Sequence, residues 1–172
     1  MILVTTGTNG APFDRLLEAV GAIRADEPLV VQHGPSHLRP AGATCVDYVS
    51  FAELVRLVRE ARVVVCHGGV GSILVSTLNG RRPLVVPRLA RFGEVVDDHQ
   101  LDLARRLDRA GLVRLVEDVS RLPELVELEP PPAQRANGLP ATGLADDLRS
   151  YLFEQLGRDD PVSGAPPGAR RR

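Results

Sequence analysis

The sequence contains no lysine, because all 21 of its basic residues are arginine. A Walker A phosphate loop, a Schiff-base lysine and a lysine general base each need the lysine ammonium group, so this absence excludes all three. Basic and acidic residues nearly balance, with a formal net charge of -1. That balance argues against a nucleic-acid partner and against a basic membrane-binding surface.

Cysteine is also scarce, with only Cys45 and Cys66, both in apolar stretches. Two thiols are too few for a cysteine-rich zinc site, and we expect both to be buried and reduced, as in the cytosol. No apolar run approaches the ~20 residues that span a bilayer. The sequence opens on a strand-like pattern with no signal-peptide pattern, so we expect a cytoplasmic location.

Short β-branched runs alternate with helical patterns, which predicts parallel βαβ units in an α/β, Rossmann-like, doubly wound sheet. We expect this single domain to cover residues 1–128 and its strands to lie in the order 3-2-1-4-5-6. Strands are predicted over residues 1–5, 29–32, 45–49, 63–66, 84–86 and 112–116. Helices are predicted over residues 12–24, 51–61 (with Ser50 as N-cap), 71–79, 98–109 and 120–127.

Residues 129–172 differ in composition, because they contain half of the 14 prolines. We interpret residues 129–143 as a Pro/Gly-rich linker and residues 158–172 as a disordered tail. Leucines at helical spacing predict one amphipathic helix over residues 144–157. Two roles are open for that helix: packing back onto the domain, or docking on a partner.

Two glycine-rich loops, residues 5–10 and residues 67–72, each follow directly after an apolar strand. In the predicted strand order both loops fall where the chain reverses direction between strands one and four, which is where open α/β sheets bind ligands. Unobstructed backbone N–H groups at a helix start bind phosphate. Each loop alone is also compatible with an ordinary tight turn. Their coincidence at the reversal point predicts a site for one nucleotide diphosphate.

The side chains of the second loop fit that site, since His67 can donate to phosphate and Ser72 can add a hydroxyl. The alternatives are a structural histidine and a polar residue that begins a helix. Residues 7–10 lack the three-glycine spacing of nicotinamide and flavin sites. The second strand ends in Gln32 and His33 rather than in an acidic residue that would grip a ribose. A dehydrogenase is therefore disfavoured.

A polar cluster follows the fifth predicted strand. Asp98, His99 and Gln100 can hydrogen-bond sugar hydroxyls, and the alternative is a capped, solvated helix start.

Four segments together resemble the glycosyltransferase family 28 C-terminal domain in their order and spacing. They are residues 5–8, 67–72, 80–87 and 98–100, and the resemblance covers residues 1–126. Within the family, the chain is most similar to the small subunit of two-part transferases that act on polyprenyl-diphosphate sugars. These include the dolichol-pathway GlcNAc transferase and bacterial exopolysaccharide enzymes, and residues 87–94 resemble the bacterial branch.

The resemblance implies the C-terminal, donor-binding half of a GT-B glycosyltransferase, which moves GlcNAc or another hexose from a UDP-sugar without cofactor or metal. It also implies a membrane-anchored acceptor-binding subunit that brings a polyprenyl-linked acceptor, so this chain would meet the membrane through its partner. The diphosphate-binding residues that it implies are Gly7, Thr8, His67, Gly68, Gly69, Gly71 and Ser72. The candidates for binding the sugar and nucleoside are Glu94, Asp98, His99 and Gln100.

One position departs from the family pattern, because the glutamate that binds the ribose hydroxyls in many relatives is Val75 here. We expect another side chain to take that role, with Glu94 as the candidate. In relatives the catalytic base usually lies in the other half, and the weak candidates in this chain are Asp14 and His99. The isolated chain is therefore expected to bind donor weakly and to turn over little. The alternative function, to which Val75 gives weight, is a non-catalytic nucleotide-sugar-binding regulatory module.

Overall fold

The computed structural model describes residues 1–24 and 26–129. Apart from Glu129, which caps the last described helix, the linker, helix and tail predicted for the C-terminal segment lie outside the described residues.

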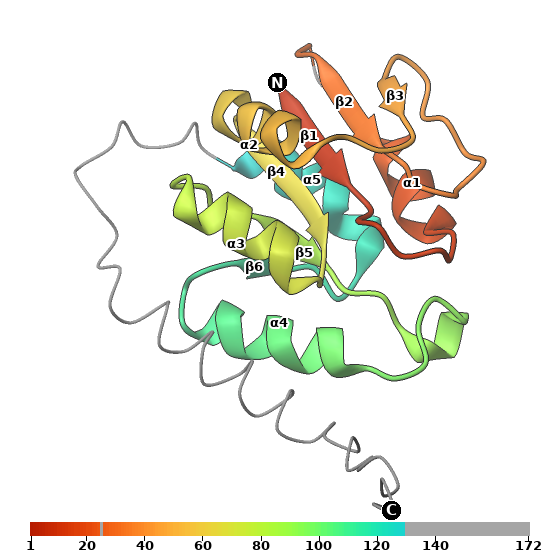
Figure 1. Cartoon of the computed structure of the whole chain (residues 1–172), viewed down its shortest axis with the longest axis vertical. Coiled ribbons are helices and arrows are strands. Elements are labelled where there is room, and N and C mark those ends of the chain that lie inside the picture. The colour runs from red at the N-terminus through yellow and green to blue at the C-terminus, as the bar shows by residue number, and fades with distance from the viewer. Residues whose placement is uncertain (25, 130–172) are drawn as a thin grey trace, which may run out of the picture. The chain divides into compact units, whose positions relative to one another are not determined.

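Six parallel strands form one sheet in the order β3-β2-β1-β4-β5-β6 (Figure 1). The predicted doubly wound order is therefore confirmed. Val4 of β1 lies opposite Val31 of β2 on one side and Val65 of β4 on the other. Because β1 and β4 are parallel neighbours, they end at the same edge of the sheet, and the strand order reverses between them. The strands are β1 (Ile2–Thr5), β2 (Leu29–Gln32), β3 (Thr44–Val46), β4 (Val63–His67), β5 (Leu84–Val86) and β6 (Arg114–Leu115).

The helices lie close to their predicted positions. Ser50 precedes α2 and its side chain accepts a hydrogen bond from the Glu53 N–H at 3.2 Å, so the predicted N-cap is confirmed. The described helices are α1 (Asp14–Val20), α2 (Phe51–Glu60), α3 (Val70–Leu78), α4 (His99–Arg109) and α5 (Leu122–Leu128). Two 3-10 turns, η1 (Ala90–Phe92) and η2 (Val119–Arg121), complete the described secondary structure.

Three elements are at least two residues shorter than predicted. The helix expected over residues 12–24 spans only Asp14–Val20. It follows Phe13, whose N–H is bonded to the Ser36 hydroxyl at 2.7 Å, and it ends at the C-cap Gly21. The strands β3 and β6 are the two edges of the sheet, and each has one neighbour to bond instead of two. Edge strands of this kind are commonly short.

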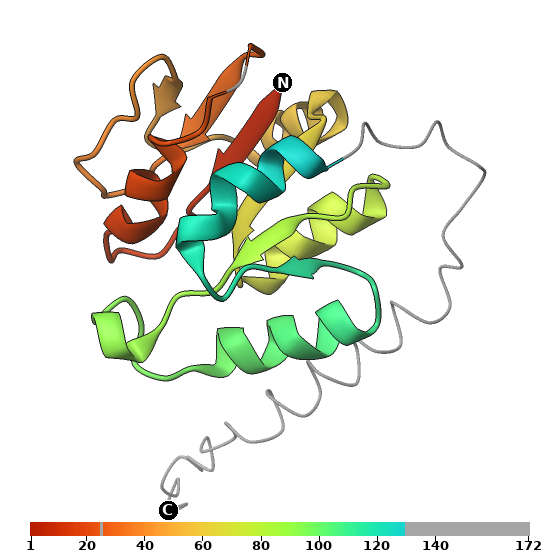
Figure 2. The ribbon, with the colours of Figure 1, turned by 180° about the vertical axis from the view of Figure 1, so that it is seen from behind.

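Helices cover both faces of the sheet. The helices α2 and α3 lie on the face turned toward the viewer in Figure 1, and α1 and α5 cover the opposite face in Figure 2. Ile2 and Val4 belong to the core beneath α1 and α5, whereas Leu3 belongs to the core beneath α2 and α3. All four residues of β1 are buried. A parallel sheet buried on both faces requires the continuous apolar strands that the sequence shows.

Both cysteines are free, and Cys66 is buried while Cys45, on the edge strand β3, is half-buried. Burial raises the pKa of the Cys66 thiol to about 12, so this thiol stays protonated and unreactive. Within residues 1–24 and 26–129, none of the helices has the length and apolar character needed to cross a lipid bilayer.

Candidate functional site

The first glycine-rich loop leaves β1 at the carboxyl edge of the sheet. Gly7 has a φ of +78°, a conformation that favours glycine. Gln32, the last residue of β2, accepts from the Gly7 N–H at 3.1 Å and donates to the Gly7 carbonyl at 3.0 Å. The Thr5 hydroxyl donates to the same Gln32 oxygen at 2.6 Å. The neighbouring strand therefore holds this loop through one amide side chain.

The second loop places His67 directly against the first. His67 is the last residue of β4, and Gly69 is the N-cap of α3. A Cβ atom on Gly7 would lie 2.3 Å from His67 Cε1, and one on Gly69 would lie 2.1 Å from His67 Nε2. Neither position has room for a methyl group, so the imidazole lies between two glycines that come from two different loops.

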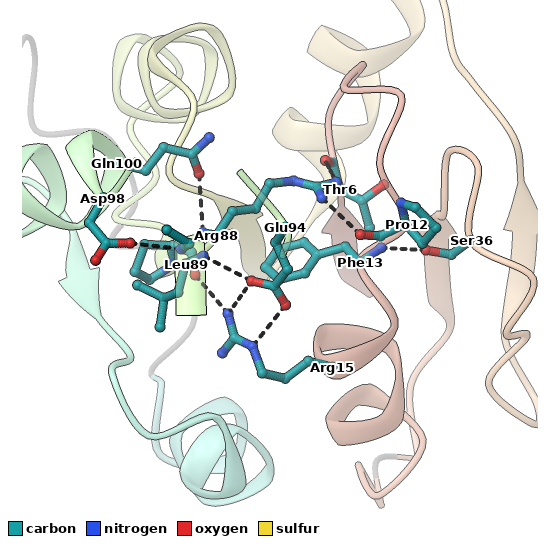
Figure 3. Close-up of polar contacts among 12 residues, drawn as sticks. Thr6, Pro12, Phe13, Arg15, Ser36, Arg88, Leu89, Glu94, Asp98 and Gln100 are labelled. Atoms are coloured by element: carbon teal, nitrogen blue, oxygen red, sulfur yellow. Dashed lines mark hydrogen bonds and ion pairs between the residues drawn. The ribbon is translucent and has the colours of Figure 1, made fainter. Parts of the chain in front are cut away.

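The second loop also meets the start of α4. A Cβ atom on Gly68 would lie 2.7 Å from Gln100 Cβ, so this glycine allows the close approach of α4. The buried Gln100 side chain accepts a hydrogen bond from the Arg88 N–H at 3.2 Å, as Figure 3 shows. The segment after β5 therefore supports the second glycine-rich loop through Gln100.

A cavity of about 260 Å³ opens beside these loops, at the ends of β1, β2 and β4 and the first turns of α2 and α3. It brings together five of the residues expected to bind the diphosphate: Gly7, Thr8, His67, Gly71 and Ser72. The other residues that line it are Thr5, Gln32, Tyr48, Val49, Phe51, Leu54 and Val75.

The cavity has one polar and one apolar side. Thr5, Thr8 and Ser72 supply hydroxyl groups near the glycine-rich loops. Tyr48 and Phe51 form part of the apolar side and are 54% and 72% exposed, so they stand at its open mouth. This division suits a ligand with a charged group at one end and a flat, weakly polar ring at the other.

His67 is neutral at pH 7. Burial lowers the pKa of His67 to about 4, the positive charge of Arg88 acts in the same direction, and the Thr5 backbone opposes both. The Nδ1 atom is buried and has no hydrogen-bond partner among the described residues. A neutral imidazole carries one N–H donor, which it can direct to an anion without bringing a full charge of its own.

The comparison with known protein families agrees with this arrangement. Residues 1–138 match the glycosyltransferase family 28 C-terminal domain. The chain belongs to this family. The family predicted from the four sequence segments is therefore confirmed.

The relatives of this family 28 domain include enzymes of natural-product glycosylation. Tylactone mycaminosyltransferase of Streptomyces fradiae is 33% identical over 128 residues, which are 66% of this chain and 27% of that enzyme. The crystal structure of the calicheamicin glycosyltransferase CalG4 matches 90% of this chain and 43% of its own, with a TM-score of 0.56 at 19% identity. The kitacinnamycin glycotransferase matches 92% of this chain and 43% of its own, with a TM-score of 0.53 at 20% identity.

The two solved structures have low sequence identity to this chain, so they establish its fold alone. Together with the family match, that fold is the one of the C-terminal half of such glycosyltransferases. The chain spans only about a quarter of its curated relative and less than half of the solved structures. Their names are those of natural-product enzymes, so these comparisons do not show the polyprenyl-diphosphate subtype expected from the sequence.

The candidates for sugar and nucleoside binding do not line the cavity. Both Glu94 oxygens accept from Arg15, at 3.0 and 2.9 Å, and one also accepts from the Leu89 N–H at 2.9 Å (Figure 3). Glu94 is thus buried and committed to the protein, not placed for a ribose. The Asp98 carboxylate accepts from the Ala90 N–H at 2.8 Å.

The two weak candidates for the catalytic base also lie away from the cavity lining. Asp14 is the first residue of α1, and its buried Oδ1 has no hydrogen-bond partner among the described residues. His99 is exposed at the start of α4 and is paired with Asp97. Within residues 1–24 and 26–129, no three His, Cys, Asp or Glu side chains are grouped so that they could hold a metal ion.

Several residues of the site were not identified from the sequence. Gln32 was considered only because it is not acidic, yet it holds Gly7 by two hydrogen bonds. Tyr48 and Phe51 flank the Ser50 N-cap at the end of β3. Two aromatic residues beside a predicted helix start, at the carboxyl edge of the sheet, were the available signal for the apolar side.

The low pKa of His67 predicts a loss of stability in mild acid. An unfolded histidine has a pKa near 6.5 and the folded one about 4, so protons favour the unfolded chain as the pH falls below 6.5. Between pH 7 and pH 5 this group should remove on the order of 2 kcal/mol from the free energy of unfolding.

Urea unfolding at both pH values measures this loss. Between pH 7 and pH 5 the variant His67→Gln should lose less stability than the wild type, and the difference should equal the contribution of His67. Equal pH dependence in the wild type and His67→Gln would show that His67 does not carry the effect.

Proposed function

We propose that the chain is the donor-binding half of an inverting glycosyltransferase that uses a UDP-sugar. The observation that carries this proposal is the meeting of two glycine-rich loops at one cavity, where Gly7 and Gly69 enclose the His67 ring. Membership of a glycosyltransferase family supports it.

The diphosphate would lie at the start of α3. This helix begins at Val70 and has no side-chain cap, and Gly71 and Ser72 of its first turn line the cavity. Helix N-termini carry about half a positive charge and bind phosphate groups. Apart from its chain neighbours and its own helix, no atom lies within 4 Å of where a Gly71 Cβ would stand, which leaves space for phosphate oxygens. His67, Thr8 and Ser72 would donate to the same group.

The uridine would occupy the apolar side of the cavity. Tyr48 and Phe51 offer aromatic faces on which a uracil ring can stack. The transferred sugar would extend from the diphosphate toward α4, where Gln100 touches Gly68 and where Asp98 and His99 begin the helix.

In the proposed reaction the acceptor hydroxyl attacks the anomeric carbon of the donor sugar and the bond from that carbon to the diphosphate oxygen breaks. The proton of the hydroxyl passes to a base, which we place in the acceptor-binding half. The bond electrons pass to the leaving UDP, whose extra charge is stabilised by the helix N-terminus and the loop N–H groups. Attack from the face opposite the leaving group inverts the anomeric configuration.

For the acceptor we propose a polyprenyl-diphosphate-linked sugar, presented by a membrane-anchored partner subunit at the cytoplasmic face. Residues 87–94, which resemble the bacterial exopolysaccharide branch, support this assignment.

A second candidate acceptor is a macrolactone or a similar natural product. The 33% identity to tylactone mycaminosyltransferase supports this alternative. The regulatory module remains the non-catalytic alternative, and it rests on Val75.

A transfer assay distinguishes these functions. We expect the chain with its membrane-anchored partner to move radiolabelled sugar from one of UDP-GlcNAc, UDP-glucose, UDP-galactose or UDP-glucuronic acid to a polyprenyl-diphosphate sugar. We expect little transfer by the chain alone, and full activity without a partner would refute the half-enzyme. Transfer to a macrolactone alone would favour the second candidate, and binding of UDP-sugar without any transfer would favour the regulatory module.

Two glycine variants serve as a matched pair in that assay and in titrations with UDP. Gly69→Ala would place a methyl group 2.1 Å from the His67 ring, whereas Gly10→Ala meets nothing within 4 Å. Displacement of the loop should weaken UDP binding by about tenfold or more in Gly69→Ala. Gly10→Ala should bind as the wild type does.

Val75 provides a separate test of where the ribose lies. This residue lines the cavity and is 8% exposed, at the position where many relatives have a ribose-binding glutamate. In Val75→Glu the carboxylate should gain hydrogen bonds to the ribose, so the preference for UDP over 2′-deoxy-UDP should rise by about tenfold. Titration calorimetry with both nucleotides measures this ratio, and Val75→Gln is the uncharged control. An unchanged ratio in Val75→Glu would place the ribose elsewhere.

A further inference from the structure

Arg88 is a buried cation, and within the described part of the chain its guanidinium is bonded to carbonyl groups and to no carboxylate. It follows β5 and its side chain is fully buried. Its guanidinium donates to the carbonyls of Pro12 at 3.0 Å and Thr6 at 3.2 Å and lies 4.5 Å from the centre of the Phe13 ring (Figure 3). Its Nε is buried and has no hydrogen-bond partner among the described residues. Burying an unpaired charge is costly, and carbonyl dipoles and a ring face offset only part of that cost.

The surrounding charges leave this cation uncompensated. Glu94 is the carboxylate that acts on Arg88, but both of its oxygens are bonded to Arg15. Burial lowers the pKa of Arg88, Glu94 opposes that effect, and Arg15 adds to it. Because a guanidinium does not lose its proton in proteins, two arginines share one carboxylate and the group carries a net positive charge.

The excess charge lies next to the first glycine-rich loop, on one side of the proposed diphosphate site. Thr6 directly precedes Gly7, so the guanidinium is bonded to both ends of the stretch from Thr6 to Pro12, which contains all of the first glycine-rich loop except Thr5. The field of Arg88 also reaches His67, whose pKa it lowers. The Arg88 N–H is bonded to Gln100, which in turn touches the second loop.

We propose that Arg88 is a positioning and specificity-determining residue, whose buried charge is balanced by the bound diphosphate and whose two carbonyl bonds hold the first glycine-rich loop. The proposal rests on the proposed function, since it assumes that a diphosphate binds between the two loops. Arginine suits this role because its planar fork reaches two carbonyls at once while it keeps its charge. The free protein then favours a dianionic ligand over a neutral one.

The test compares a charged with an uncharged ligand in two variants. Arg88→Gln removes the charge and Arg88→Lys keeps it, and both retain the backbone N–H that binds Gln100. Calorimetric dissociation constants are measured for UDP and uridine, and for dTDP and thymidine, with the full chain. In Arg88→Gln the preference for diphosphate over nucleoside should fall by about tenfold or more, with nucleoside binding unchanged within about twofold. In Arg88→Lys most of that preference should remain, even where both ligands bind somewhat more weakly.

The control is Arg91→Gln, since Arg91 is an exposed arginine in the same segment whose guanidinium lies 4.9 Å from the centre of the Phe92 ring. It should keep the wild-type preference. Equal weakening of diphosphate and nucleoside in Arg88→Gln would show a merely structural role and overturn the proposal, and so would an unchanged preference. A wild-type chain that binds none of the four ligands would instead refute the proposed function.

A measurement on the wild type covers the case in which Arg88→Gln does not fold. The buried Nε–H of Arg88 should give a slowly exchanging ¹⁵N signal, which its loss in Arg88→Lys identifies. Addition of UDP should shift this signal and addition of uridine should not. A signal that does not move with UDP, in a chain that binds UDP, would overturn the proposal.

Discussion

The contact of one imidazole with two glycines is the constraint on which the site depends. His67 ends β4 and its ring fills the space between Gly7 and Gly69, so the first and second loops touch through it. Either glycine with a side chain would separate the loops. The contact is possible only because β1 and β4 are neighbours in the sheet, which brings the ends of two strands that are distant in sequence to one edge. The geometry of the site therefore requires the strand order that the sheet has.

Supporting contacts hold this arrangement from three sides. Gln32 holds the first loop from β2, Gln100 supports the second from α4, and Arg88 joins the segment after β5 to both. These three side chains are buried, with their polar atoms bonded mainly to backbone groups. Buried polar contacts of this kind fix one conformation because each unmet hydrogen bond is costly. The cavity thus has a preformed polar side, while its apolar side is open at Tyr48 and Phe51.

Much of this could be predicted from the sequence. The strand order followed from the alternation of strands and helices, and the N-cap at Ser50 from local hydrogen-bonding chemistry. The meeting of the two loops followed from that order. The commitment of Glu94 to Arg15 could not be predicted, since the two residues are 79 positions apart and only the tertiary fold brings them together. The same holds for the burial of Arg88, whose guanidinium reaches the carbonyls of Thr6 and Pro12, 82 and 76 positions away.

The amide of Gln32 distinguishes this chain from dinucleotide-binding proteins with the same strand order. Its oxygen faces an N–H and a hydroxyl while its nitrogen faces two carbonyls, those of Gly7 and Asp47. A carboxylate there would lose both donations, and the carbonyls of Gly7 and Asp47 would lose this donor. Dinucleotide folds use an acid at the end of the second strand to bind the adenosine ribose. Here the same position is occupied by an amide that holds the first glycine-rich loop in place.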